Sequence, residues 1–202
     1  MGEKKVTVLL VGIGGYGGVY LDELLHKPRG EQFRIVGAAD PYADRSQFMD
    51  ELRSRRIPVY DTVGEFYREQ RADLAIIATP IYLHGCLARY CMEHGSDVLC
   101  EKPICATLDE AGTMMAVRNR TGRRLAIGFQ WCYSDSVRRL KKDILEGRYG
   151  KLRRIRTVVF FPRNADYFRR SSGWAGKRCM GSGEWVLDSV ASNAAAHYLQ
   201  NM

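Results

Sequence analysis

The sequence predicts an α/β fold, a doubly wound and mostly parallel sheet followed by the start of a second, α+β domain. Two observations support this prediction. From residue 6 to about residue 130, apolar stretches of strand length alternate with stretches of helical spacing, a pattern typical of parallel strands joined by helices. In addition, glycines crowd the junction between the first strand and the first helix, in "VGIGGYGG".

The first strand and the first helix flank a glycine-rich turn. A β-branched run over residues 6–11 predicts the strand, and the apolar residues of 19–25 recur at helical spacing. Between them, Gly12, Gly14 and Gly17 form the pattern G-x-G-x-x-G. This pattern at a strand-to-helix turn is the fingerprint of a Rossmann-type dinucleotide-binding unit.

Each glycine of this turn has its own mechanical reason. Gly12 permits the tight turn, Gly14 lets a pyrophosphate approach the backbone, and Gly17 lets the helix pack closely on the strand. The N-terminus of the following helix then offers N–H groups and a positive dipole end to the phosphates. The predicted cofactor-binding residues of this turn are Gly12, Ile13, Gly14, Gly15, Tyr16 and Gly17.

A second strand, "FRIVGAAD", ends in an acidic residue. Asp40 lies 23 residues beyond Gly17, near the spacing expected for the carboxylate that binds the 2′-hydroxyl of the ribose and repels a 2′-phosphate. The alternative is a plain turn residue, because Asp before Pro41 commonly opens a turn. We predict the cofactor role, and therefore NAD in preference to NADP, although Arg45 lies close enough in sequence to accommodate a phosphate.

The remaining elements of the sheet follow in regular alternation. Helices are expected over residues 42–56, 62–69, 83–95 and 107–122, and strands over residues 58–60, 72–80, 96–103 and 124–130. In a doubly wound sheet, ligands bind beyond the carboxyl ends of the strands. Residues at those ends are therefore candidates for the site, namely Thr79, Pro80, Glu101, Lys102 and Gln130.

Lys102 stands at the end of a buried strand, between Glu101 and Pro103. Because Pro103 disfavours the helical region for the residue before it, Lys102 is restricted to extended geometry. Its side chain is then expected to leave the strand end toward the crevice. The alternative is a pair of charges that merely caps the strand at the surface.

Four stretches together resemble the family of glucose-fructose oxidoreductase, inositol dehydrogenase and MocA: "VGIGGYG", "IIATPIYLHGCLA", "HGSDVLCEKPICATLDEA" and "IGFQWCYSDSVRRLKKDILEGRYGKLRRI". The resemblance covers nearly the whole chain, and Glu-Lys-Pro is its most specific part. It implies that Thr79 and Pro80 lie along the nicotinamide half of NAD, with His84 near the cleft. It also implies that Lys102 reaches the nicotinamide ribose and a substrate hydroxyl.

The predicted domains are a dinucleotide-binding domain, residues 1–129, and a partial substrate or oligomerisation domain, residues 130–202. The stretch "KLRRIRTVVFFPR" is expected to form the first strand of the second domain. In the family this domain is an extensive, mostly antiparallel sheet, of which the chain would hold only the beginning. We expect the apolar segment "IRTVVFFP" to form an unpaired edge that recruits another chain, so a homo-oligomer is predicted.

The family places an aspartate and, four residues later, a histidine beside the lysine. Here Asp188 fits the aspartate, but Ser192 stands four residues on and the histidine is His197. Nine residues put two side chains on opposite sides of a helix, so Asp188 orients His197 only if it precedes the helix. Asn193 and His197 do share a helical face. His197 is thus either the catalytic base or a structural histidine.

The predicted function is an NAD-dependent oxidoreductase that acts on a secondary alcohol of a sugar, cyclitol or related polyol. Lys102 would stabilise the developing alkoxide, and His197, with Asp188, would remove the proton. The alternatives are a non-catalytic NAD-binding sensor or assembly module, and NAD-dependent glycosidic cleavage. Four basic residues would favour an anionic substrate, and Trp174 would stack on a sugar ring or pack in the core. The basic residues are Arg163, Arg169, Arg170 and Lys177.

Charge is distributed unevenly along the chain. Residues 1–122 carry 15 Lys and Arg against 17 Asp and Glu, whereas residues 123–202 carry 16 against 6. Basic and aromatic residues interleave in the second part, as they do in nucleic-acid-binding proteins. Charged side chains along a strand more often form a solvated face or an oligomer surface. We therefore predict such a surface here in preference to a nucleic-acid-binding site.

The apolar runs and the cysteines of the sequence indicate where in the cell the protein is expected. The longest apolar runs fall short of the roughly 18 residues of a membrane span, so no membrane association is expected. The six cysteines form no C-x-x-C pair, and several lie in strand or helix patterns where free cysteine acts as a small hydrophobe. We predict a cytoplasmic protein without a metal site.

Overall fold

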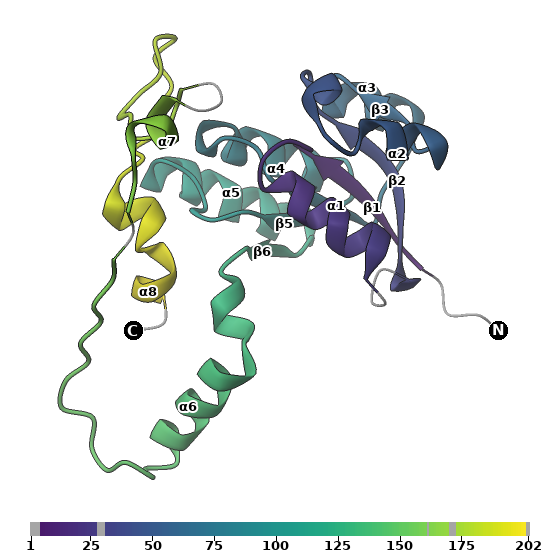
Figure 1. Cartoon of the computed structure of the whole chain (residues 1–202). Coiled ribbons are helices and arrows are strands. Elements are labelled where there is room, and N and C mark those ends of the chain that lie inside the picture. The colour runs from purple at the N-terminus through teal and green to yellow at the C-terminus, as the bar shows by residue number, and fades with distance from the viewer. Residues whose placement is uncertain (1–4, 28–30, 161, 170–172, 201–202) are drawn as a thin grey trace. The chain divides into compact units, whose positions relative to one another are not determined.

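The computed structural model describes residues 5–27, 31–160, 162–169 and 173–200 (Figure 1). The chain divides into two compact units, Met1–Ile127 and Gly128–Met202. The first unit contains a six-stranded sheet in the order β3-β2-β1-β4-β5-β6, and all paired strands are parallel. This is the strand order of a dinucleotide-binding Rossmann fold, and it confirms the predicted fold class.

The strands and helices of the first unit alternate as predicted. The strands are β1 (Val6–Val11), β2 (Phe33–Ala39), β3 (Val59–Tyr60), β4 (Leu74–Ile77), β5 (Asp97–Cys100) and β6 (Leu125–Ile127). The helices are α1 (Gly17–His26), α2 (Met49–Ser54), α3 (Val63–Glu69), α4 (His84–Glu93) and α5 (Leu108–Thr121), with 3-10 turns η2 (Ala43–Arg45) and η3 (Ile81–Leu83).

One predicted helix is divided. The sequence predicted a continuous helix over residues 42–56, whereas η2 ends at Arg45 and α2 begins only at Met49. Ser46 between them has extended backbone angles, and its hydroxyl donates to the carbonyl oxygen of Ile13 at 2.9 Å. A serine side chain that bonds to the backbone competes with helix formation. The break therefore connects this segment to the glycine-rich turn.

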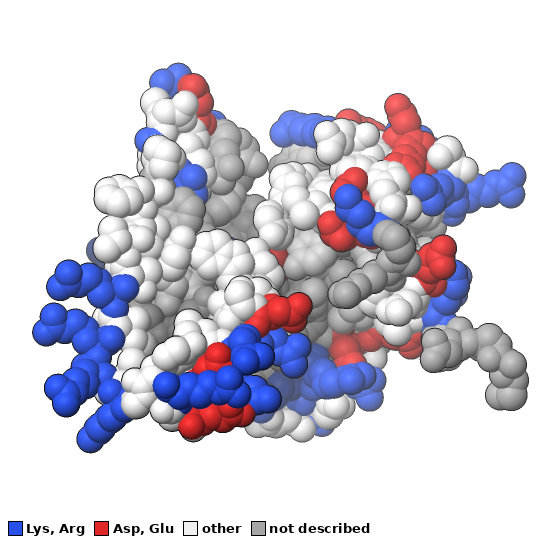
Figure 2. Space-filling view, turned by 60° about the horizontal axis from the view of Figure 1, so that its bottom comes forward, with Lys and Arg blue, Asp and Glu red and all other residues white. Residues whose placement is uncertain are grey.

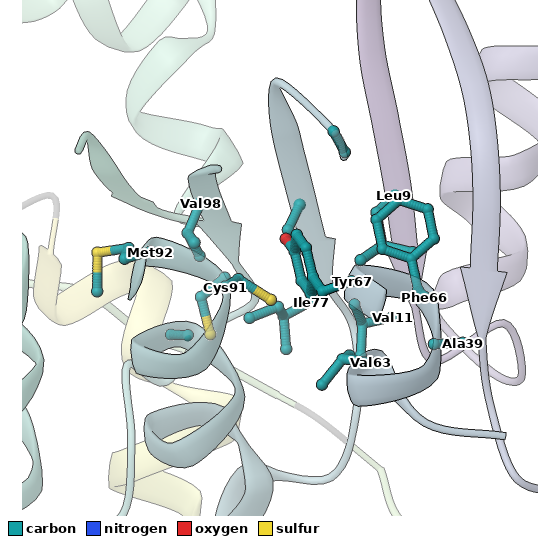
Figure 3. Close-up of a cluster of buried hydrophobic side chains, with 14 of the residues drawn as sticks. Leu9, Val11, Ala39, Val63, Phe66, Tyr67, Ile77, Cys91, Met92 and Val98 are labelled. Atoms are coloured by element: carbon teal, nitrogen blue, oxygen red, sulfur yellow. The ribbon is translucent and has the colours of Figure 1, made fainter. Parts of the chain in front are cut away.

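Alternate residues of each strand face opposite sides of the sheet. On one side, Leu9 and Val11 pack with residues of α3, α4 and α5, including Phe66, which is fully buried (Figure 3). On the other side, Val8 and Leu10 pack with residues of α1 and α2. Full burial of one such apolar side chain stabilises the fold by about 1.5–3 kcal/mol. The rigid sheet fixes the strand ends that carry the candidate site residues.

The second unit is mostly helical and irregular. Its elements are η4 (Gln130–Tyr133), α6 (Asp135–Leu145), α7 (Ala165–Arg169), the π-helix η5 (Val190–Ala194) and α8 (Ala196–Gln200). An isolated antiparallel bridge joins Cys179 and Trp185.

The strand predicted over residues 151–163 is wrong for residues 151–160 and 162–163, the part of it that the structure describes, because these residues have no strand assignment. Val158 and Phe160 are 69% and 88% exposed. A strand needs the N–H and C=O groups of a neighbouring strand. No second strand pairs with this segment within the described residues of the unit, so its β propensity does not produce a strand.

Charged side chains cover much of the surface. Figure 2 shows Lys and Arg side chains projecting into solvent, with Asp and Glu side chains between some of them. Arg153, Arg154 and Arg156 are exposed, as a solvated segment requires. No helix in the described ranges combines the length and the apolar character needed to cross a bilayer.

Candidate cofactor and catalytic site

The glycine-rich turn is closed by contacts that only glycine allows. Gly12 has a φ of +83°, and a methyl group there would lie 2.9 Å from the carbonyl oxygen of Ala78. A methyl group on Gly17 would lie 2.0 Å from the carbonyl oxygen of Gly12. The turn therefore packs against the end of β4 on one side and against α1 on the other. β1 and β4 are adjacent in the sheet, at the point where the strand order reverses.

The middle of the same turn is open. Among the described residues, no atom outside the immediate chain neighbours lies within 4 Å of the position that a side-chain methyl would occupy on Gly14 or Gly15. Gly15 also has a positive φ, +48°, which favours glycine. The open backbone, followed directly by the N-terminus of α1, gives a phosphate group access to main-chain N–H groups.

Asp40 follows β2 and is bound to the glycine-rich turn. Its Oδ2 accepts a hydrogen bond from the N–H of Ile13 at 2.9 Å, and its Oδ1 accepts one from the N–H of Tyr42 at 2.8 Å. The second bond is the turn contact that the alternative interpretation predicted, and the first ties the carboxylate to the phosphate-binding turn. Each carboxylate oxygen keeps a second lone pair that can accept from a ribose hydroxyl. Arg45 lies over the ring of Tyr42, 4.8 Å from its centre.

The loop after β4 holds an unsatisfied polar group. Thr79 and Pro80 lie two and three residues beyond the end of β4, and the Thr79 side chain lies beside Gly12. The hydroxyl oxygen of Thr79 is buried and has no hydrogen-bond partner among the described residues. Buried hydroxyls are normally hydrogen bonded, so this one is suited to a ligand that brings its own donor or acceptor.

His84, at the start of α4, connects two loops of the site. Its Nδ1 lies 2.8 Å from the carbonyl oxygen of Pro103, and its Nε2 lies 2.9 Å from that of Thr79. The side chain is only 1% exposed. Both ring nitrogens face backbone carbonyls, so the buried ring holds the two loops together, and contact between His84 and the cofactor stays a prediction. Burial lowers the pKa of His84, and the two carbonyls oppose that shift.

The Glu-Lys-Pro segment follows β5 at the same edge of the sheet. The N–H of Glu101 donates to the carbonyl of Ile77 at 2.8 Å, and Lys102 is half-buried. The peptide bond between Lys102 and Pro103 is cis. The Glu101 carboxylate accepts a 2.6 Å hydrogen bond from the phenol of Tyr20. Burial raises the pKa of Glu101, and the Tyr20 hydrogen bond and Lys102 act in the opposite direction.

The candidate residues Asp188 and His197 of the second unit each contact other residues of that unit. Asp188 precedes η5, and its carboxylate accepts hydrogen bonds from Asn193 Nδ2 at 2.8 Å and from the Gly176 N–H at 2.6 Å. His197 lies in α8 and is 7% exposed. Its ring stacks on Trp131, with 4.7 Å between the ring centres. Asp188 thus meets the condition that it lie before the helix.

The other predicted residues of this unit are scattered. Gln130 begins η4, and Trp174 is half-buried. Arg163 lies over the ring of Tyr167 at 4.2 Å, and Arg169 pairs with Asp166 at 3.7 Å. Lys177 is exposed, and Arg170 falls outside the described residues. Arg163 and Arg169 therefore have partners within the chain.

Two contributors to the site were missed in the sequence. Ser46 holds the glycine-rich turn through Ile13, and Tyr20 holds Glu101. Neither belongs to the G-x-G-x-x-G pattern or to the Glu-Lys-Pro segment. The helical spacing of 19–25 did place Tyr20 one turn beyond Gly17, which was the only available signal. In the described part of the chain, no group of three or more His, Cys, Asp or Glu residues is placed to hold a metal ion.

Comparison with known proteins agrees with this geometry. The profile of the GFO/IDH/MocA oxidoreductase family, with an NAD-binding Rossmann fold, matches residues 6–129. The chain is 28% identical over 167 residues to an inositol 2-dehydrogenase of Rubrobacter xylanophilus, which covers 81% of the chain and 46% of that relative. The chain spans about half the length of the curated relatives that it matches.

Solved structures share the fold. The WlbA dehydrogenase from Bordetella pertussis, in complex with NADH and UDP-GlcNAcA, superposes with a TM-score of 0.84 at 22% identity, covering 98% of this chain and 56% of that one. The scyllo-inositol dehydrogenase from Lactobacillus casei, with bound NAD(H) and scyllo-inositol, has a TM-score of 0.63 at 18% identity and covers 73% and 43%.

Proposed function

The chain belongs to the GFO/IDH/MocA oxidoreductase family, and on that premise we propose that it binds NAD and serves hydride transfer at a secondary alcohol of a sugar, cyclitol or related polyol. The observation that carries the proposal is the bond from Ile13 N–H to Asp40, 2.9 Å long, beside the open backbone of Gly14. It brings a carboxylate suited to a ribose diol next to a turn suited to a pyrophosphate.

The residues of the first unit fit NAD. Gly14 and Gly15 leave room for the pyrophosphate, and the Asp40 carboxylate would accept a hydrogen bond from the adenosine ribose. The buried Thr79 hydroxyl would hydrogen bond to a polar group of the cofactor. A 2′-phosphate would meet the negative charge of Asp40, so NAD is preferred over NADP. Bound NAD supplies the hydride acceptor, and the protein supplies orientation and charge.

Lys102 is proposed as the group that faces the substrate hydroxyl. It follows β5 at the carboxyl edge of the sheet, where ligands of this fold bind. Its ammonium group would hydrogen bond to the alcohol oxygen and stabilise the negative charge that develops there as hydride leaves the carbon. His197, in the unit that includes Asp188 and Asn193, is proposed as the base that takes the hydroxyl proton.

The relatives support the proposed substrate class. An inositol 2-dehydrogenase and a scyllo-inositol dehydrogenase are among the proteins similar to this chain, and both act on cyclitols by name. We propose the same class of secondary alcohol here, with residues 1–129 as the cofactor domain and residues 130–202 as part of the substrate or oligomerisation domain. A homo-oligomer in the cytoplasm remains our prediction for the assembly and its location.

The test is to incubate the protein with NAD and a panel of inositols, sugars and sugar acids while following NADH absorbance. The proposal expects NADH to accumulate with at least one polyol and to depend on Lys102. Glycosidic products without accumulated NADH would instead support the transient-redox alternative. Binding of NAD without reaction of any alcohol would support the sensor or assembly module.

A further inference from the structure

Tyr20 and Glu101 join two elements of the site that lie far apart in the sequence. Tyr20 lies in α1, three residues beyond Gly17, and its hydroxyl donates to Oε1 of Glu101 at 2.6 Å. Glu101 is 8% exposed, so this bond is largely shielded from water. A hydrogen bond to a buried carboxylate is shorter and stronger than one between neutral groups. The helix that begins at the glycine-rich turn is thereby fastened to the segment after β5.

The second oxygen of the same carboxylate holds the backbone of Lys102. Oε2 of Glu101 accepts from the N–H of Lys102 at 3.2 Å. The β5–β6 ladder ends at Cys100, and Pro103 has no N–H to donate. The direction in which the chain leaves β5 is set by the Glu101 N–H bond to Ile77 and by the contact of His84 with the Pro103 carbonyl. This carboxylate adds the bond to the Lys102 N–H, from whose residue the lysine side chain begins.

The hydrogen bonds from the Tyr20 hydroxyl and the Lys102 N–H favour the ionised form of Glu101. Tyr20 faces it from α1 and Tyr16 from the residue before that helix, and Cys100 and Lys102 are the titratable groups next to it in its own segment. Burial raises the pKa of Glu101, whereas the Tyr20 hydrogen bond is the largest effect that lowers it. Burial and the carboxylate raise the pKa of Tyr20, so the phenol keeps its proton and remains the donor. Loss of the phenol would leave a buried carboxylate with one donor fewer.

We propose that Tyr20 is a positioning residue for Lys102, acting through the carboxylate of Glu101. The proposal rests on the function assigned above to Lys102. Tyr20 touches neither substrate nor the reacting atoms in this account. Its hydrogen bond favours the ionised form of Glu101 and holds the carboxylate in place, and Glu101 in turn bonds to the backbone N–H of Lys102.

Tyr20→Phe removes only the hydroxyl, and Tyr60→Phe is the matched control. The Tyr60 phenol also donates to a glutamate, Glu69, at 3.1 Å, but at an exposed position. The first measurement is a pH titration of the protein with ¹³C-labelled glutamate carboxyl groups, in which Glu101→Gln identifies the Glu101 signal. We expect Tyr20→Phe to raise the titration midpoint of Glu101 by about one pH unit and to shift the backbone amide signal of Lys102.

The same variant should move the acid limb of kcat/KM for polyol oxidation to higher pH by a similar amount, with the Kd for NAD within about threefold of wild type. Tyr60→Phe should change neither quantity. An unchanged Glu101 midpoint in Tyr20→Phe would overturn the proposal, as would a shifted midpoint with an unmoved Lys102 amide. Failure of the wild-type protein to bind NAD would contradict the proposed function alone, because the titration does not require cofactor.

Discussion

The carbonyl oxygen of Gly12 lies where it would be 2.0 Å from a methyl group on Gly17. The clashing atom belongs to the backbone, so no side-chain rotation relieves it. The close approach joins the end of β1 to the start of α1 and shapes the turn proposed to hold the pyrophosphate.

Gly17→Ala should therefore destabilise the protein by about 3 kcal/mol, at the upper end of the usual cost of overpacking, and abolish detectable NAD binding. Urea unfolding and calorimetry measure the two effects. The control is Gly112→Ala in α5, where nothing lies within 4 Å of the added methyl. That change should stabilise the protein by about 0.5–1 kcal/mol. Equal stability changes in the two variants would refute the packing argument.

Asp40→Asn should weaken NAD binding while keeping the contact with the glycine-rich turn, because the asparagine oxygen can still accept from Ile13. The Tyr42 N–H loses its acceptor, since the amide NH2 group only donates. Loss of a charged acceptor costs about 1.5–3 kcal/mol, so the Kd for NAD should rise by about 10–100-fold. Affinity for NADP should fall less or rise, since the repulsion of its 2′-phosphate is removed. Asp44→Asn, an exposed change nearby, serves as control. A parallel loss for both cofactors would argue that Asp40 is only a turn residue.

Lys102→Met should lower kcat for polyol oxidation by at least about tenfold and leave the Kd for NAD within about threefold, because the lysine is assigned to charge that develops in the transition state. Lys5→Met, at an exposed position just before β1, is the control and should change neither. Steady-state kinetics and calorimetry provide both numbers. If kcat of the Lys102 variant stays within about threefold of wild type, the assigned role is wrong and Lys102 only caps the strand.

His84 should make the fold less stable in acid. Burial holds its pKa below the usual 6.5, so the unfolded chain takes up a proton that the folded protein resists. The stability that neutral His84 contributes is complete above pH 6.5 and is lost as the pH falls from there through the lower folded value. The thermal midpoint of wild type should therefore fall more steeply below pH 6.5 than that of His84→Gln.

His26 provides the opposite control. Hydrogen bonds from its ring to Asp22 and Glu51 raise its pKa, so protonated His26 stabilises the fold at low pH and His26→Gln should steepen the acid loss. The thermal midpoints of the three proteins are compared between about pH 7.5 and pH 5, the range in which histidine ordinarily titrates. Identical acid profiles for wild type and His84→Gln would contradict the role given to the buried ring.

The exposed apolar residues of the segment after α6 should promote self-association. Ile155, Val158 and Phe160 are 40%, 69% and 88% exposed, and apolar side chains on an extended, unpaired backbone tend to recruit another chain. Replacing Val158 and Phe160 with Lys should lower the mass in solution, as measured by light scattering after size exclusion. The control is Leu108→Lys, an exposed change in the other unit. A monomeric wild type would contradict this prediction.

The sheet could be predicted from the sequence because the patterns that indicate its strands and helices are local. Strand and helix periods and the glycine spacing all lie within short windows, so the strands and the turn at Gly12 could be located. The bond between Tyr20 and Glu101 joins residues 81 positions apart, and no local pattern relates them. Likewise, residues 151–160 have the composition of a strand, but strand formation depends on partners that local propensity does not supply. His84 was found by resemblance, whereas its burial between two carbonyls depends on how both loops fold.

The central claim is that the glycine-rich turn and Asp40 form an NAD site, and calorimetric titration of the wild-type protein with NAD and with NADP tests it most directly. We predict saturable binding of NAD with a Kd at least about tenfold lower than that for NADP, as the repulsion between Asp40 and a 2′-phosphate requires. Absence of NAD binding, or tighter binding of NADP, would contradict the account.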